Sequence, residues 1–137
     1  FYKQSTKRHT TNSEFDVSKL ETLPRVDIIY SHVDDDRIMA DAAVAAGAKG
    51  IIHAGTGNGS IANPTMEGLK DAVAKGVVVV RSARVPNGAT TVSLPMWTKA
   101  GFLESDTLNP QKARLLLQLA LTKTQDPKEI QRMFDQY

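Results

Sequence analysis

The chain has 137 residues, of which 41% are hydrophobic and 23% charged, the usual balance of a globular domain with one core. Its net charge of +2 is too small, and its basic residues are too scattered, to indicate a nucleic-acid-binding protein. It contains no cysteine, which excludes a thiol nucleophile, a disulfide and a thiolate metal site within these residues. No apolar run approaches the roughly 20 residues that a membrane-spanning helix needs.

The first 24 residues are polar and lack periodicity, as in an interdomain linker or an extended arm. We expect the basic cluster Lys7-Arg8-His9 to be solvated or to face an interface rather than to bind phosphate. The chain begins at Phe1 and shows no leader pattern, so we expect it to be part of a longer protein.

After Pro24, short apolar strands alternate with helices. The expected strands and helices, in chain order, are residues 26–30, 38–46, 50–54, 64–75 and 77–80. Gly47 and Gly76 follow the two helices, where glycine commonly ends a helix. Near-continuous apolar strands separated by helices are typical of a parallel sheet covered by helices, with right-handed crossovers. The predicted fold class is therefore α/β, a three-layer Rossmann-like parallel sheet flanked by helices.

The C-terminal third is expected to be helical. Asn109-Pro110 and Asp126-Pro127 each place a capping side chain before a proline at the first helical position. Apolar residues at helical spacing follow both pairs. Between the sheet and these helices, we interpret the segment around Met96 and Trp97 as irregular, with both side chains packed rather than ligand-binding.

Ligands of open parallel sheets bind beyond the carboxyl ends of the strands. The loops expected there are residues 31–36, 55–62 and 81–91. The second loop is the most informative, because alternating glycines permit positive φ and close approach of backbone to a ligand. Asn58 and Ser60 supply donors and acceptors suited to an amide or a carboxylate. The spacing matches neither a dinucleotide fingerprint nor a P-loop, so a simple turn remains an equal alternative.

Two other groups could carry chemistry. The aspartates at positions 34–36 could suggest a metal site, but negative charge also stabilises a helix N-terminus, which we favour. The histidines His9, His32 and His53 lack the spacing of a zinc site or of a nucleophile and its base. We expect His53 to be packed or hydrogen-bonded, and we expect no metal and no cofactor.

Several blocks of the sequence occur together in one order. They are residues 15–20 (FDVSKL), 23–24 (LP), 54–60 (AGTGNGS), 80–82 (VRS), 84–85 (RV), 88–91 (GATT), 108–114 (LNPQKAR) and 136–137 (QY). From about residue 7 to its end, the chain thereby resembles the C-terminal part of the bacterial type II L-asparaginases and glutaminase-asparaginases, and the block at 108–114 is the most specific.

The resemblance implies a two-domain subunit of a homotetramer, a dimer of dimers, that hydrolyses L-asparagine and, to a variable degree, L-glutamine to the acid and ammonia. The family's threonine nucleophile lies in an N-terminal catalytic domain whose motifs are absent here, so no catalytic residue is expected in this segment. Residues 1–24 would be the linker and residues 25–137 the C-terminal domain, which lends substrate contacts to a neighbouring subunit. The type II resemblance also suggests the periplasm, without nucleic-acid or membrane partners.

The resemblance also implies the substrate contacts. Family members carry Asn or Ser at the position of Ser60, where the side chain contacts the substrate's amino-acid head group. Asn58 is expected to join it in substrate binding, and Gly57 and Gly59 to shape the loop.

One expected contact is missing. The family's glutamate that pairs with the substrate ammonium follows the stretch matching Thr90-Thr91, but residues 92–99 contain no carboxylate. Glu104 lies further on, at a position that the family does not use. The missing glutamate favours a second hypothesis, a non-catalytic α/β binding or assembly module. A phosphate-binding enzyme that uses the glycine-rich loop is a third and weaker one.

Overall fold

The computed structural model describes residues 6–92 and 94–137. In chain order the elements are η1 (Thr10–Asn12), β1 (Val26–Tyr30), α1 (Ile38–Ala45), β2 (Gly50–Gly55), α2 (Asn63–Ala74), β3 (Val78–Ala83), α3 (Pro95–Lys99), β4 (Leu103–Glu104), α4 (Pro110–Leu121) and α5 (Pro127–Gln136). The strands form one sheet in the order β1-β2-β3-β4, and every neighbouring pair is parallel.

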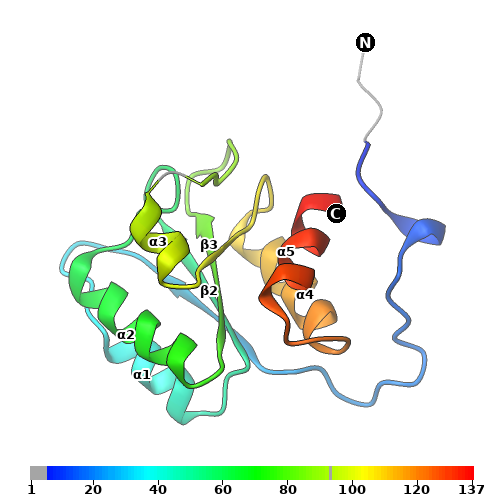
Figure 1. The fold of residues 1–137 in the computed structure, drawn as a ribbon, viewed down its shortest axis with the longest axis horizontal. Coiled ribbons are helices and arrows are strands. Elements are labelled where there is room, and N and C mark those ends of the chain that lie inside the picture. The colour runs from blue at the N-terminus through cyan, green and yellow to red at the C-terminus, as the bar shows by residue number, and fades with distance from the viewer. Residues whose placement is uncertain (1–5, 93) are drawn as a thin grey trace.

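Helices cover both faces of this sheet (Figure 1). On one face, α1, α2 and Trp97 of α3 enclose a core that includes Ile51 and Val79. On the other face, α4 and α5 pack over Ile52 and Val80. Successive residues of a strand point to opposite faces, so the inner strands β2 and β3 are buried at every position. The predicted three-layer α/β architecture is confirmed.

The predicted helix ends are also confirmed. Asn109 Oδ1 accepts a hydrogen bond from the Lys112 N–H at 2.9 Å, and Asp126 Oδ1 accepts one from the Lys128 N–H at 3.0 Å. Near the start of α1, Asp36 Oδ1 accepts from the Ile38 N–H at 2.8 Å, as expected of a carboxylate at a helix N-terminus.

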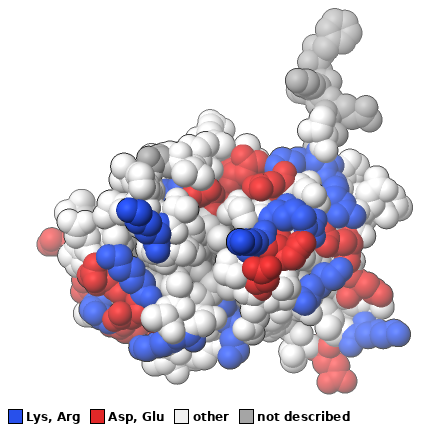
Figure 2. Space-filling view, in the orientation of Figure 1, with Lys and Arg blue, Asp and Glu red and all other residues white. Residues whose placement is uncertain are grey.

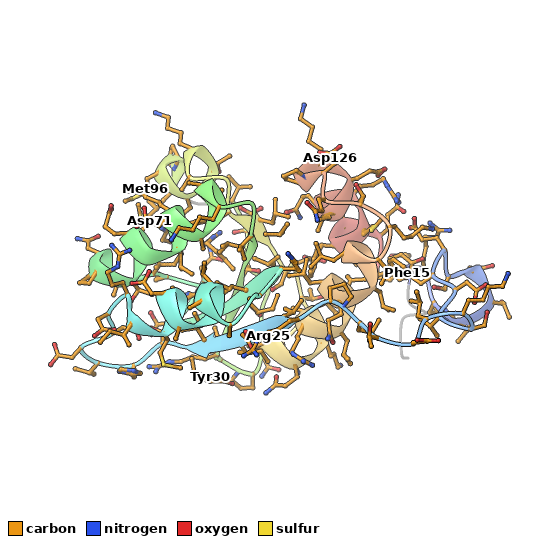
Figure 3. The ribbon with its side chains drawn as sticks, turned by 90° about the horizontal axis from the view of Figure 1, so that it is seen from below. Phe15, Arg25, Tyr30, Asp71, Met96 and Asp126 are labelled. Carbon is orange, nitrogen blue, oxygen red and sulfur yellow. The ribbon has the colours of Figure 1, made fainter. Side chains whose placement is uncertain are left out.

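The segment between β3 and α4 differs from the prediction of an irregular stretch. It contains the short helix α3 and the two-residue strand β4. Strand β3 also continues to Ala83, three residues beyond the expected end at Val80. Trp97 is packed as predicted, but Met96 is 44% exposed and points outward from α3 (Figure 3), so the expectation that it packs was wrong.

The N-terminal arm, residues 6–24, runs alongside α4 and α5 (Figure 1). The Phe15 ring (Figure 3) contacts the Tyr137 ring, with 5.1 Å between the two ring centroids. Glu14 accepts hydrogen bonds from Arg8 at 3.0 Å and from Arg132 at 2.9 Å. The hydrogen bond from Arg132 is the main reason that the pKa of Glu14 is held below its ordinary value. Residues 1–5 of the expected linker lie outside the described residues, and the linker role stays a prediction.

The surface mixes charges of both signs. On the face shown in Figure 2, Lys and Arg alternate with Asp and Glu over the helices, without a large area of one sign. Within residues 6–92 and 94–137, no helix combines the length and the apolarity that crossing a membrane requires.

Candidate functional site

The glycine-rich loop follows β2 directly. Thr56 and Ser60 form an antiparallel bridge, and the Ser60 N–H donates to the Thr56 carbonyl at 2.8 Å. The loop needs glycines for two reasons. Gly57 and Gly59 have φ of +50° and +71°, as the alternating glycines predicted. A Cβ on Gly55 would lie 2.3 Å from the Ser60 carbonyl oxygen, so only glycine allows the turn to close.

Ser60 and Asn58 have different environments within this loop. Ser60 is exposed at the carboxyl edge of the sheet. Asn58 is half-buried, and its side chain binds the loop that follows β3. Its Nδ2 lies 3.2 Å from Thr91 Oγ1, and its Oδ1 accepts from the Thr91 N–H at 2.8 Å. The Asn58 amide therefore joins two loops, while direct substrate contact by either residue stays a prediction.

Arg81 lies beneath both loops. Its side chain is fully buried, and its guanidinium donates to the carbonyl of Asn58 at 3.1 Å, of Gly59 at 3.4 Å and of Thr91 at 2.9 Å. The sequence analysis did not select Arg81 as a site residue. The available signal was a single arginine directly after a run of valines, in a strand that a parallel sheet buries on both faces.

Two side chains accompany the buried charge of Arg81. The guanidinium carbon lies 4.0 Å from the centroid of the Trp97 ring, a cation–π arrangement. Glu104 Oε1 lies 3.4 Å from Arg81 Nη2. Burial lowers the pKa of Arg81 and Glu104 partly offsets this, but a guanidinium remains charged at neutral pH. Glu104 is the counter-ion of Arg81.

The loop after β1 contributes a second buried polar group. Asp35 is 5% exposed, and its Oδ2 lies 3.9 Å from Nε2 of the fully buried His53. Burial lowers the pKa of His53 to about 4, so His53 is neutral at pH 7 and this long contact is not an ion pair. Of the two predicted alternatives for His53, packed or hydrogen-bonded, the structure shows the first. Its side chain is buried, and neither ring nitrogen has a hydrogen-bond partner among the described residues.

The three predicted loops meet at one edge of the sheet. Asn58 joins the second loop to the third, and Arg84 Nη1 donates to the Ser31 carbonyl at 2.7 Å, which joins the third to the first. In the part of the chain that the structure describes, no cluster of three His, Asp or Glu side chains could hold a metal ion. A surface hollow of about 420 Å³, lined in part by Pro24 and Lys49, lies at the amino ends of β1 and β2, away from these loops.

The fold and the loops define an α/β domain with a polar loop at the carboxyl edge of a parallel sheet. This loop is held in place by hydrogen bonds to Arg81 and Thr91. Residues 25–134 match the family described as Glutaminase/Asparaginase C-terminal domain, and the chain belongs to this family.

Three relatives show how much of a family member the chain spans. It is 50% identical to L-asparaginase 2 of Bacillus subtilis over 137 residues, which are 100% of the chain and 36% of that relative. It is 48% identical to the probable L-asparaginase periplasmic of Haemophilus influenzae over 131 residues, 95% of the chain and 38% of the relative. It is 47% identical to the glutaminase-asparaginase of Acinetobacter glutaminasificans over 146 residues, 100% of the chain and 43% of the relative. The chain thus spans less than half the length of each.

Proposed function

We propose that this chain is the substrate-binding C-terminal part of an amidohydrolase that converts L-asparagine and, to a variable degree, L-glutamine to the acid and ammonia. Family membership and the names of the three relatives support the reaction class. The observation that carries the assignment is the glycine-rich loop, which is fixed by hydrogen bonds and carries the exposed Ser60.

Ser60 supplies a hydroxyl that can accept from an ammonium group or donate to a carboxylate, the two charged groups of an amino acid. Its role is binding rather than nucleophilic attack, because a serine nucleophile needs a base within hydrogen-bond reach. The nearest histidine along the chain, His53, lies in β2 and is 0% exposed. The threonine nucleophile is supplied by the N-terminal domain of the same enzyme.

The assembly and compartment of the proposed enzyme follow the same resemblance. It is a homotetramer, a dimer of dimers, in which this domain lends Ser60 to a neighbouring subunit; light scattering of the full-length enzyme measures its mass. It is periplasmic, which the name of the Haemophilus influenzae relative supports. Fractionation of the source cells tests the compartment, and activity in the cytoplasmic fraction alone would contradict it.

The Ser60→Ala variant of the full-length enzyme tests the substrate contact. We expect kcat/KM for L-asparagine to fall about tenfold or more, since a hydrogen bond to a charged group contributes about 1.5–3 kcal/mol. Ser18→Ala is the matched control, because Ser18 is an exposed serine in the arm. An unchanged kcat/KM in Ser60→Ala would remove Ser60 from the substrate site.

A non-catalytic binding or assembly module makes a different prediction for the same protein. The full-length protein would then bind L-asparagine or a partner without releasing ammonia. An enzyme-coupled ammonia assay on the unmodified protein therefore separates the two functions before any variant is made.

A further inference from the structure

Arg81 contacts both loops of the proposed site through their backbone. Its guanidinium binds carbonyls of the glycine-rich loop on one side and the Thr91 carbonyl of the following loop on the other. These are the same two loops that the Asn58 side chain joins. Two independent connections, one buried and one at the surface, therefore fix one loop relative to the other.

The contact with Asn58 also orients the peptide next to the proposed substrate position. In a trans peptide the C=O and the N–H point in opposite directions. Because the Asn58 carbonyl points inward to Arg81, the Gly59 N–H points away from it. The same reasoning applies at the next peptide, where the Gly59 carbonyl faces Arg81 and the Ser60 N–H reaches the Thr56 carbonyl.

A lysine could not replace this arrangement. Arginine presents a planar fork of several donors, which here reaches three carbonyl oxygens while its face lies against Trp97. A lysine ammonium at the end of a flexible stem lacks both the planar face and the spread of donors. Burying the cation is tolerated because Glu104 and Trp97 stabilise it.

We propose that Arg81 is a positioning residue that holds the glycine-rich loop, and through it Ser60, in the geometry that binds substrate. Trp97 of α3 and Glu104 of β4 contact the Arg81 guanidinium and stabilise its charge. This inference rests on the proposed function for its kinetic consequence, but its structural consequence is measurable without activity.

Hydrogen exchange measures the structural part. In full-length Arg81→Lys, we expect the amides of residues 55–62 to exchange about tenfold or more faster than in the unmodified protein, because loss of the inward contacts frees the loop. Arg114→Lys is the matched control, since Arg114 of α4 also donates to a backbone carbonyl, that of Val26, at 2.7 Å, but at the amino end of β1. Unchanged exchange in Arg81→Lys would overturn the proposal, whether or not the protein is an asparaginase.

A double-mutant cycle measures the functional part. We expect Arg81→Lys to raise KM for L-asparagine about tenfold while changing kcat less, because it displaces a binding group. The kcat/KM of the double variant Arg81→Lys/Ser60→Ala should lie within about twofold of that of the more impaired single variant, because both substitutions act on the same substrate contact. Effects that multiply independently would overturn the proposal.

Two further results are informative. If Arg81→Lys fails to fold, Trp97→Leu, which removes the face beneath the guanidinium and leaves β3 intact, takes its place in both measurements with the same criteria. If the unmodified protein releases no ammonia, the proposed function fails, and the exchange of residues 55–62 alone supports or overturns the positioning role of Arg81.

Discussion

Two buried polar residues lie side by side in the sheet, because His53 of β2 pairs in register with Arg81 of β3. Their environments differ. Arg81 finds carbonyl partners in two loops, whereas both ring nitrogens of His53 lack hydrogen-bond partners among the described residues. An unpaired buried polar group lowers stability, so a neutral imidazole is tolerated here more easily than a charged one.

His53 should make stability depend on pH in the acid range. Burial lowers its pKa from 6.5 to about 4, so between these values the unfolded chain binds a proton that the folded protein does not. The contribution of His53 is fully present above about pH 6.5 and is lost as pH falls toward about 4, by about 3 kcal/mol in all. Urea unfolding of the protein from pH 7 to pH 4 measures this loss.

The variant His53→Leu isolates that contribution. It removes the titrating group from an apolar layer, so its free energy of unfolding should fall less steeply over the same pH range. His9→Gln is the control, because His9 is exposed in the arm. A pH dependence identical in His53→Leu and in the unmodified protein would show that His53 does not cause the loss.

Among the elements, those with clear periodicity or end signals could be predicted from the sequence. Strand β1 has its expected bounds, and α4 and α5 begin at the predicted prolines. The short elements α3 and β4 could not be predicted, since five and two residues carry no periodicity. They form because Trp97 and Leu103 are buried against the sheet and its helices, which is a tertiary effect.

The candidate site was predictable only where a local signal determines its shape. Glycine permits positive φ, so the alternating glycines predicted a tight loop, and Gly57 and Gly59 do have positive φ. The engagement of Asn58 with Thr91 and of Arg81 with three carbonyls depends on loops that are distant in sequence. No local pattern records those contacts.

The arm should stabilise the domain through Phe15. The ring is half-buried against Tyr137 at the end of α5, so Phe15→Ala should lower the free energy of unfolding by about 1–2 kcal/mol, less than full burial of such a ring would contribute. Thermal and urea unfolding measure the change. Val17→Ala is the control within the arm, since Val17 is 52% exposed. Equal free energies of unfolding for Phe15→Ala and Val17→Ala would mean that the contact of Phe15 with Tyr137 does not stabilise the domain.

At the scale of the whole molecule, the helices hold the arm and the sheet collects the loops. The arm contacts α5 and the turn after α4 through Arg132 and Lys123. The carboxyl-terminal edge of the sheet brings together the three loops with Ser60, Asn58 and Arg84. Ligand binding at the carboxyl edge of parallel strands is the general rule for such folds. The central claim is that this edge binds substrate while the nucleophile comes from another domain.

Ammonia release from L-asparagine, measured in parallel on the full-length enzyme and on the 137-residue chain, tests that claim most directly. Circular dichroism and intact mass on the same samples establish that each protein is folded and of the expected size. The account predicts turnover by the full-length enzyme and none by the folded chain. Turnover by the chain alone would place the nucleophile among these residues, and absence of turnover in the full-length protein would remove the proposed function; either result would contradict the account.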